Sequence, residues 1–257
     1  MERYKKVLFV KIHDIWFETE KYNKSSENVV ALHTNQVLDK SLFDEVFVTK
    51  TMLIDISCDK DIIFKEFDYK SARYPINKAT KDGIIVKRVE NEEEEKQFFS
   101  FHASFCREKG IPILSQNELA ELECYSAWTQ EKEYLGGCAF FTSQEEGTVR
   151  YKYGSTKHKM NANEIILWKA MCDYHDRGFR WFDMGGVIPT EDKDSYYYRH
   201  FKFKEKFGGK LVDSYTYFKF KGIERFFYYI FKVFLKLFFA NDINGFTNFL
   251  SRHHIIR

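Results

Sequence analysis

The chain has 257 residues, of which 44% are hydrophobic and 30% are charged, and this balance is typical of a folded globular protein rather than a disordered one. The formal net charge of +2 argues neither for nor against a nucleic-acid partner. The five cysteines form no Cys-x-x-Cys pair, so neither a disulfide framework nor a metal site is supported. The first apolar run, Val7–Val10, is too short for the core of a signal peptide. We therefore expect a reduced, cytoplasmic protein.

Residues 1–82 predict a partial domain followed by a basic helical connector. Short apolar runs bounded by polar clusters predict strands at residues 7–10, 29–32, 46–49 and 52–56. Residues 59–82 have a helical and strongly basic pattern, and Pro75 predicts a kink or a helix boundary near Tyr74. Gly83 predicts the end of this helical segment.

Residues 83–221 predict a complete second domain. The expected elements are a strand at 84–89, helices at 92–109 and 116–124, and strands at 125–129, 134–142 and 148–153. A helix from Asn161 or Asn163 to Arg177 follows, then a strand at 179–184 that ends at Gly185-Gly186, a helix to Lys206 and a strand at 211–220. This order resembles the GNAT acyltransferase fold, which implies an α+β (α/β) protein with a mixed, mostly antiparallel sheet flanked by helices. Residues 1–82 then form a partial second GNAT-like unit.

Two stretches carry a more specific resemblance. The first is TMLIDIS followed by KSARYPINKATKDGIIVKRV (Lys70–Val89), and the second is LWKAMCDYHDRGFRWFDMGGV with FKEKFGG (Phe203–Gly209). They resemble the Fem-type (peptidoglycan-bridge) aminoacyltransferases, a FemAB-like branch of the GNAT superfamily. Bridge-forming members have two complete GNAT-like domains, whereas this chain has room for one complete copy and about half of another. It also has no heptad arm, and Pro75 interrupts a helix that usually continues.

The candidate catalytic residues lie on the second stretch and the helix after it. Lys204 matches the lysine of the family pattern F-K-x-x-F-G, and the resemblance implies that it stabilises negative charge on the donor or the intermediate. Asp183 and His200 are candidate bases for the proton of the attacking amine, and Tyr197 is a further candidate. Alternatives stay open: Asp183 as a turn cap, His200 as an ordinary surface or core histidine, and Tyr197 as a packing residue.

The candidate binding residues form three groups. In the GNAT fold the helix after the third meander strand points its N-terminus at the phosphates of the donor, and here the corresponding residues are Gly154, Ser155, Thr156 and Asn163. This loop lacks the glycine spacing of ordinary acetyl-CoA enzymes. Gly185 and Gly186 allow a ligand to approach the backbone closely. Arg73 and Lys78 are candidates for binding a phosphate on the acceptor, with a solvated helix face as the alternative.

Residues 222–257 predict an amphipathic tail. Within Phe226–Phe239 only Lys232 and Lys236 are charged, and both fall on one helical stripe with Arg225. The apolar run is shorter than the ~20 residues that span a bilayer, but it suits a helix lying in the membrane interface. The alternative is that this helix packs on the protein itself or on a second copy, as in a homodimer.

Together these patterns predict a cytoplasmic N-acyltransferase at the inner face of the cell membrane. It would move an acyl group from acyl-CoA, or a similar activated donor, to an amine of a cell-envelope glycan or peptide precursor, without a permanently bound cofactor. One alternative is an aminoacyl-tRNA-dependent aminoacyltransferase acting on a peptidoglycan precursor, the only case with a nucleic-acid partner. A second alternative is a catalytically inactive GNAT-like binding module.

Overall fold

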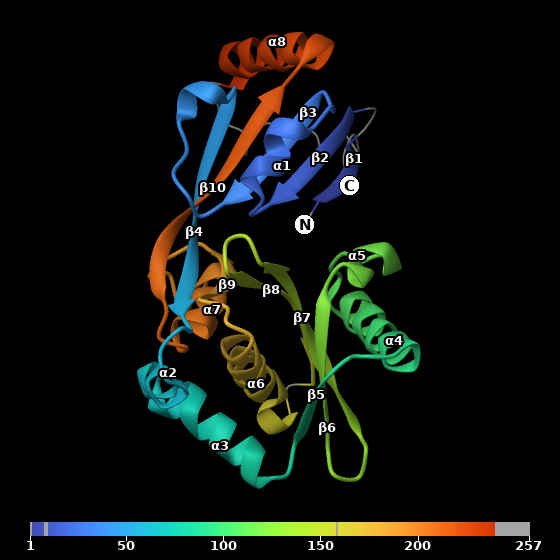
Figure 1. Cartoon of the computed structure of the whole chain (residues 1–257), viewed down its shortest axis with the longest axis vertical. Helices are drawn as coiled ribbons and strands as arrows, with labels where there is room; N and C mark the ends of the chain where they lie inside the picture. Colours follow the sequence, from blue (N-terminus) through green and yellow to red (C-terminus); the bar gives the residue numbers. More distant parts are fainter. Residues whose placement is uncertain (1, 8–9, 158, 240–257) are drawn as a thin grey trace. The chain divides into compact units, whose positions relative to one another are not determined.

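The computed structural model describes residues 2–7, 10–157 and 159–239, which form two compact units (Figure 1). The larger unit contains residues 34–36 and 48–215, and the smaller contains the described residues among 2–33, 37–47 and 216–239. Two long strands, β4 (Glu45–Asp55) and β10 (Lys210–Phe220), contribute residues to both units. The expected boundary after residue 82 therefore falls inside the larger unit, and the one after residue 221 falls inside the smaller unit.

The larger unit is built on a sheet with the strand order β10-β4-β9-β8-β7-β6-β5. Its remaining strands are β5 (Ile85–Arg88), β6 (Glu123–Trp128), β7 (Tyr134–Ser143), β8 (Thr148–Thr156) and β9 (Trp181–Val187). The pairs β4–β9, β5–β6, β6–β7 and β7–β8 are antiparallel, and β8–β9 is parallel. The predicted mixed, mostly antiparallel sheet is confirmed.

Helices cover both faces of this sheet. On one face lie α4 (Glu92–Lys109) and α5 (Gln116–Ala120), and on the other lies α6 (Ala162–Asp176), as Figure 1 shows. Successive side chains of β7 point to opposite faces of the sheet. Ala139 packs with Phe98 of α4 on one face, whereas Cys138 and Phe140 belong to the core that includes α6 on the other face. The basic connector comprises α2 (Lys60–Glu66), the π-helix η2 (Tyr69–Arg73) and α3 (Tyr74–Lys81), and η3 (Lys159–Asn161) and α7 (Tyr196–Glu205) complete the unit.

Local signals account for several helix limits. Four glutamates occupy the first turn of α4, where the helix dipole favours negative charge, and Asn91 caps that turn by accepting a hydrogen bond from the Glu94 backbone N–H at 3.0 Å. The helix ends at Gly110, whose φ of 64° is left-handed. Pro75 stands in the first turn of α3, so the predicted boundary near Tyr74 is confirmed.

Two expectations about strands were wrong. The runs at 46–49 and 52–56 form one strand, β4, and Gly185-Gly186 lies inside β9 rather than at its end. The reason is the pairing of β9 with β4, in which Thr51 pairs with Gly186 but Leu53 pairs with Asp183. The extra residue in β9 makes a bulge, and Gly185 supplies the positive φ of 82° that the bulge requires.

The smaller unit is also a sheet with helices. Its described elements are β1 (Glu2–Val7), β2 (Val10–Trp16), α1 (Thr19–Lys24), β3 (Val29–Thr34), η1 (Lys40–Leu42) and α8 (Gly222–Phe239). β1 and β2 are antiparallel, β2 and β3 are parallel, and Ile15, Leu32 and Tyr217 are fully buried. Within the described residues, no helix combines the length and apolar character needed to cross a membrane. Residues 240–257 of the predicted tail lie outside the described part of the chain.

Gly208, in the FKEKFGG stretch, offers a test of backbone packing in the larger unit. It has a φ of +72°, and a Cβ there would lie 2.5 Å from the Glu66 carbonyl oxygen, whereas Gly110 has a similar φ of +64° and no neighbour within 4 Å. We expect Gly208→Ala to lower the free energy of unfolding by about 3 kcal/mol and Gly110→Ala by about 1 kcal/mol, since only the first adds a clash to the strain. Denaturant unfolding measures both, and equal losses would contradict the assignment.

Candidate active site

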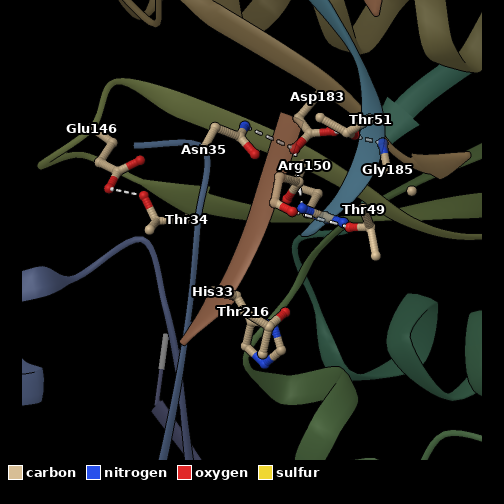
Figure 2. Close-up of polar contacts among 12 residues, drawn as sticks. His33, Thr34, Asn35, Thr49, Thr51, Glu146, Arg150, Asp183, Gly185 and Thr216 are labelled. Atoms are coloured by element: carbon tan, nitrogen blue, oxygen red, sulfur yellow. Dashed lines mark hydrogen bonds and ion pairs between the residues drawn. The ribbon is translucent and has the colours of Figure 1, made fainter. Parts of the chain in front are cut away.

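Asp183 is the centre of a polar cluster on the sheet of the larger unit. Its side chain is fully buried in the middle of β9, and Figure 2 shows donors around it. Four groups donate to its carboxylate: the Thr51 hydroxyl, the Gly185 backbone N–H at 2.7 Å, the Arg150 guanidinium at 3.1 Å and the Asn35 amide at 3.3 Å. A carboxylate buried this completely is tolerated because hydrogen bonds and a cation offset its lost hydration.

The position of Asp183 limits what it can do chemically. The bond from the Gly185 N–H is the local backbone bond expected of a turn cap, and the other three donors come from distant parts of the chain. With both oxygens engaged and no exposed surface, the carboxylate is arranged to position its neighbours rather than to meet a substrate.

Lys204 lies beside this cluster. It extends from α7, and its ammonium group donates to the Gly186 carbonyl oxygen at 2.8 Å. A Cβ on Gly185 would come within 3.4 Å of Lys204 Nζ, so the glycine leaves room for the lysine. Burial and, to a smaller extent, the positive charge of Arg150 lower the pKa of Lys204 to about 8 against the opposing effect of the Asp183 charge. The structure thus brings Asp183, Gly185, Gly186 and Lys204 together.

The cluster stands where two parallel strands stop pairing. The β8–β9 ladder runs from Thr148–Trp181 to Arg150–Asp183, although β8 continues to Thr156 and β9 to Val187. Past Arg150 and Asp183, the described residues of β8 pair with β7 and those of β9 pair with β4, but not with each other. The β8–β9 ladder therefore ends beside the Asp183 cluster.

A pocket of about 240 Å³ opens at the start of α6 and is also lined by a residue of α7. Asn161, the N-cap residue of α6, makes no capping bond through its side chain, so the first-turn N–H groups have no side-chain cap. An uncapped N-terminus of a 15-residue helix favours an anionic ligand. The lining residues include Phe105, Gly154, Thr156, Lys157, Asn163 and Phe203.

Three of the four predicted donor-binding residues line this pocket, and the fourth is placed differently. Ser155 is 2% exposed, and its hydroxyl lies 2.7 Å from Nδ1 of the buried His102. The Leu114 backbone N–H points at Nε2 of the same ring, at 3.5 Å, so Nδ1 carries the proton that is donated to Ser155. Ser155 thus connects β8 to α4.

The remaining candidates of α7 are exposed. Tyr197 is 49% exposed in the first turn, and His200 stacks on the Tyr196 ring at 4.3 Å between centroids. Partial burial lowers the pKa of His200, and the positive charges of Lys204 and Arg199 lower it further. A neutral imidazole is the form that can accept a proton.

Arg73 and Lys78 lie apart from the pocket on the connector. The Arg73 guanidinium lies 5.3 Å from the centre of the Tyr69 ring, and its Nε is buried with no hydrogen-bond partner among the described residues. Lys78 pairs with Asp82 at 2.6 Å on the exposed side of α3. Within the described part of the chain, neither residue lines the pocket at α6.

Comparison with known proteins places this arrangement in a structural class. No protein-family model matches the sequence, and a search of curated protein sequences finds no match. Among solved structures, FemX matches with a TM-score of 0.62 and 14% identity over 84% of this chain and 83% of FemX. The chain has the fold of FemX. L-PGS from Bacillus licheniformis matches with a TM-score of 0.56 and 10% identity over 86% of this chain and 81% of L-PGS.

A third match supports the same fold. It is the C-terminal domain of a protein assigned as a lysylphosphatidylglycerol synthetase from Agrobacterium fabrum, with a TM-score of 0.55 and 11% identity over 86% of this chain and 81% of that domain. The predicted resemblance to a FemAB-like branch of the GNAT superfamily is thus confirmed at the level of fold.

Several residues of the polar cluster and its surroundings had not been predicted. Arg150, Thr51 and Asn35 all donate to Asp183, and Thr51 and Asn35 are more than 100 residues away from it in sequence. Of these three residues, Arg150 is the one that the sequence could have indicated, because it is a charged residue inside the strand TVRYKYGST. Glu146 was also missed: burial raises its pKa to about 7, and it accepts a hydrogen bond from Thr34 at 3.2 Å.

The lowered pKa of Lys204 implies that its buried ammonium group lowers the free energy of unfolding of the protein. Replacing Lys204 with the uncharged Met should raise the free energy of unfolding at pH 7 by about 1 kcal/mol, since burying the ammonium is unfavourable. Lys202→Met is the matched control, because Lys202 is exposed and pairs with Glu205 at 2.5 Å, and it should change stability by less than about 0.5 kcal/mol. Chemical denaturation measures both, and a loss of stability in Lys204→Met would contradict this account.

The pH dependence has a defined sign. Between about 8 and the usual value of 10.5, the unfolded chain holds the Lys204 proton and the folded chain does not, so wild-type stability rises with pH in this window. The advantage of Lys204→Met should shrink over the same window.

Proposed function

We propose that this protein is an N-acyltransferase that moves an acyl group from an activated donor to an amine of a cell-envelope glycan or peptide precursor. The observation that carries the proposal is the position of Lys204, a half-buried ammonium held on the Gly186 carbonyl where β8 and β9 stop pairing. Its agreement with the F-K-x-x-F-G pattern and the FemX-like fold support the same reading.

The donor would enter along the facing edges of β8 and β9. Phosphate groups of a donor such as acyl-CoA suit the N-terminus of α6, where Asn161 makes no side-chain capping bond. Phe203 lines the same pocket and belongs to α7, the helix that carries Lys204.

The transfer needs an oxyanion stabiliser and a base. The acceptor amine attacks the donor carbonyl carbon, and negative charge develops on the carbonyl oxygen, where the Lys204 ammonium stabilises it. The amine proton passes to a neutral base, for which His200 is the candidate because its pKa is lowered. Collapse of the tetrahedral intermediate releases the thiol or hydroxyl of the donor. Asp183 holds Arg150 and the Gly185 backbone in place throughout.

The second candidate function keeps this chemistry and changes the donor. The two stretches that resemble Fem-type enzymes favour an aminoacyl-tRNA donor and a peptidoglycan-precursor acceptor. The two donors are distinguished by adding ribonuclease to an assay that contains charged tRNA, acyl-CoA and an amino-sugar nucleotide. Loss of product on ribonuclease treatment indicates the tRNA donor, and unchanged product indicates the acyl-CoA donor.

Removing the Lys204 ammonium should abolish most of the transfer. We expect Lys204→Met to lower kcat by about 10²–10³-fold, with a smaller effect on KM, since the charge acts mainly on the developing oxyanion. Lys202→Met, two residues away on the same helix, should retain wild-type kcat. Donor consumption is the measurement. Full activity in Lys204→Met would contradict the role given to Lys204, and no donor consumed by the wild type would favour the inactive binding module.

The descending limb of the pH–rate profile should report Lys204. Activity should fall above about pH 8 as the ammonium loses its proton. Asp183→Asn should move this limb to lower pH, because the Asp183 charge raises the pKa of Lys204, and Arg150→Gln should move it to higher pH, because Arg150 lowers that pKa. Profiles of kcat for the three proteins check the opposite shifts, and shifts in the same direction would contradict the assignment.

A further inference from the structure

One face of α8 is held on the smaller unit. Arg225 pairs with the buried Asp44 at 3.0 Å, and the Tyr228 hydroxyl donates to Glu45. The Tyr228 ring stacks on Phe220 of β10, with centroids 4.2 Å apart and planes 10° apart. These contacts fix which side of the helix faces away from its own unit.

The opposite face presents large apolar side chains to solvent. Ile223, Phe226, Phe227 and Ile230 are 63%, 62%, 59% and 49% exposed, and we call these four residues the α8 stripe. Their spacing of i, i+3, i+4 and i+7 places them on one side of the helix. Because their neighbours hold the helix by polar bonds and stacking, the stripe is exposed without being needed for the fold.

The sequence extends the stripe and gives the helix a positive charge. Val233, Phe234, Leu237 and Phe238 continue the same spacing toward the end of α8 at Phe239. Within Gly222–Phe239 the charged residues are Glu224, Arg225, Lys232 and Lys236, and the three basic residues fall on one side at helical spacing. The helix has 18 residues and does not meet the requirements for crossing a bilayer.

We propose that the α8 stripe lies on the surface of a bilayer that contains anionic lipids. An in-plane helix buries its apolar face at the boundary of headgroups and acyl chains. Lys232 and Lys236 supply the positive charge that attracts lipid phosphates, since Arg225 is paired with Asp44. A binding surface for a protein partner usually has a polar rim around an apolar centre. The α8 stripe instead continues along the helix sequence as a row of apolar residues. The inference concerns the smaller unit and does not depend on the proposed transfer chemistry.

Vesicle co-sedimentation of the purified full chain tests the proposal. We expect binding to vesicles of phosphatidylcholine with one quarter phosphatidylglycerol, and binding at least about tenfold weaker to phosphatidylcholine alone. The triple variant Phe226→Ser, Phe227→Ser, Ile230→Ser should lose about tenfold or more of the binding to anionic vesicles. Circular dichroism should show an unchanged fold, because all three side chains are exposed.

A matched control uses exposed apolar residues of the larger unit. Ile62, Ile111 and Ile113 are 53%, 46% and 41% exposed, and their replacement by Ser should leave vesicle binding unchanged. Wild-type protein that stays in the supernatant, or equal binding by the two triple variants, would overturn the proposal. So would light scattering that shows a wild-type dimer and a monomeric stripe variant, because a second copy would then occupy the stripe.

Discussion

The buried carboxylate of Asp183 is the interaction on which the rest of the site depends. It accepts hydrogen bonds from Thr51 of β4, Arg150 of β8 and the Gly185 backbone of β9 itself. An anion at this depth requires all of its donors, because each one lost leaves charge without compensation. The three strands are therefore fixed to one another at the point where β8 and β9 stop pairing.

The same carboxylate sets the electrostatics of the cluster. Arg150 and Lys204 contribute two positive charges and Asp183 one negative charge, so the cluster has a net positive charge. Arg150 is engaged by Asp183, whereas Lys204 is held by the neutral Gly186 carbonyl. Its ammonium can therefore interact with new negative charge without first breaking an ion pair. Burial lowers its pKa to about 8, so the ammonium is still protonated at neutral pH but titrates only slightly above it.

Local patterns determine most of the element order, which is why it could be predicted. The caps of α4, the proline in α3 and the glycine after each of these helices act within a few residues of the boundary they define. The glycine pair of β9 was misread because its conformation depends on β4, about 130 residues earlier in the sequence. The division into two compact units likewise depends on long-range pairing, since β4 and β10 contribute residues to both. A sequence pattern does not reveal which strand will continue past a bulge.

The same distinction between local and long-range signals applies to the residues of the candidate site. Lys204 could be proposed from the sequence because it is a charged residue in a glycine-flanked motif, and Gly185-Gly186 because a glycine pair indicates an unusual backbone conformation, here the positive φ of Gly185. Thr51 and Asn35 carry no signal, since a threonine in a strand and an asparagine after one are ordinary residues until folding brings them to Asp183. Asp183 itself looked like a base because sequence shows the carboxylate but not its donors. Because Asp183 is fully buried, its role in the proposed chemistry is to hold the neighbouring groups in place rather than to accept a proton. The chemistry proposed for Lys204 therefore depends on an acid that need not touch the substrate.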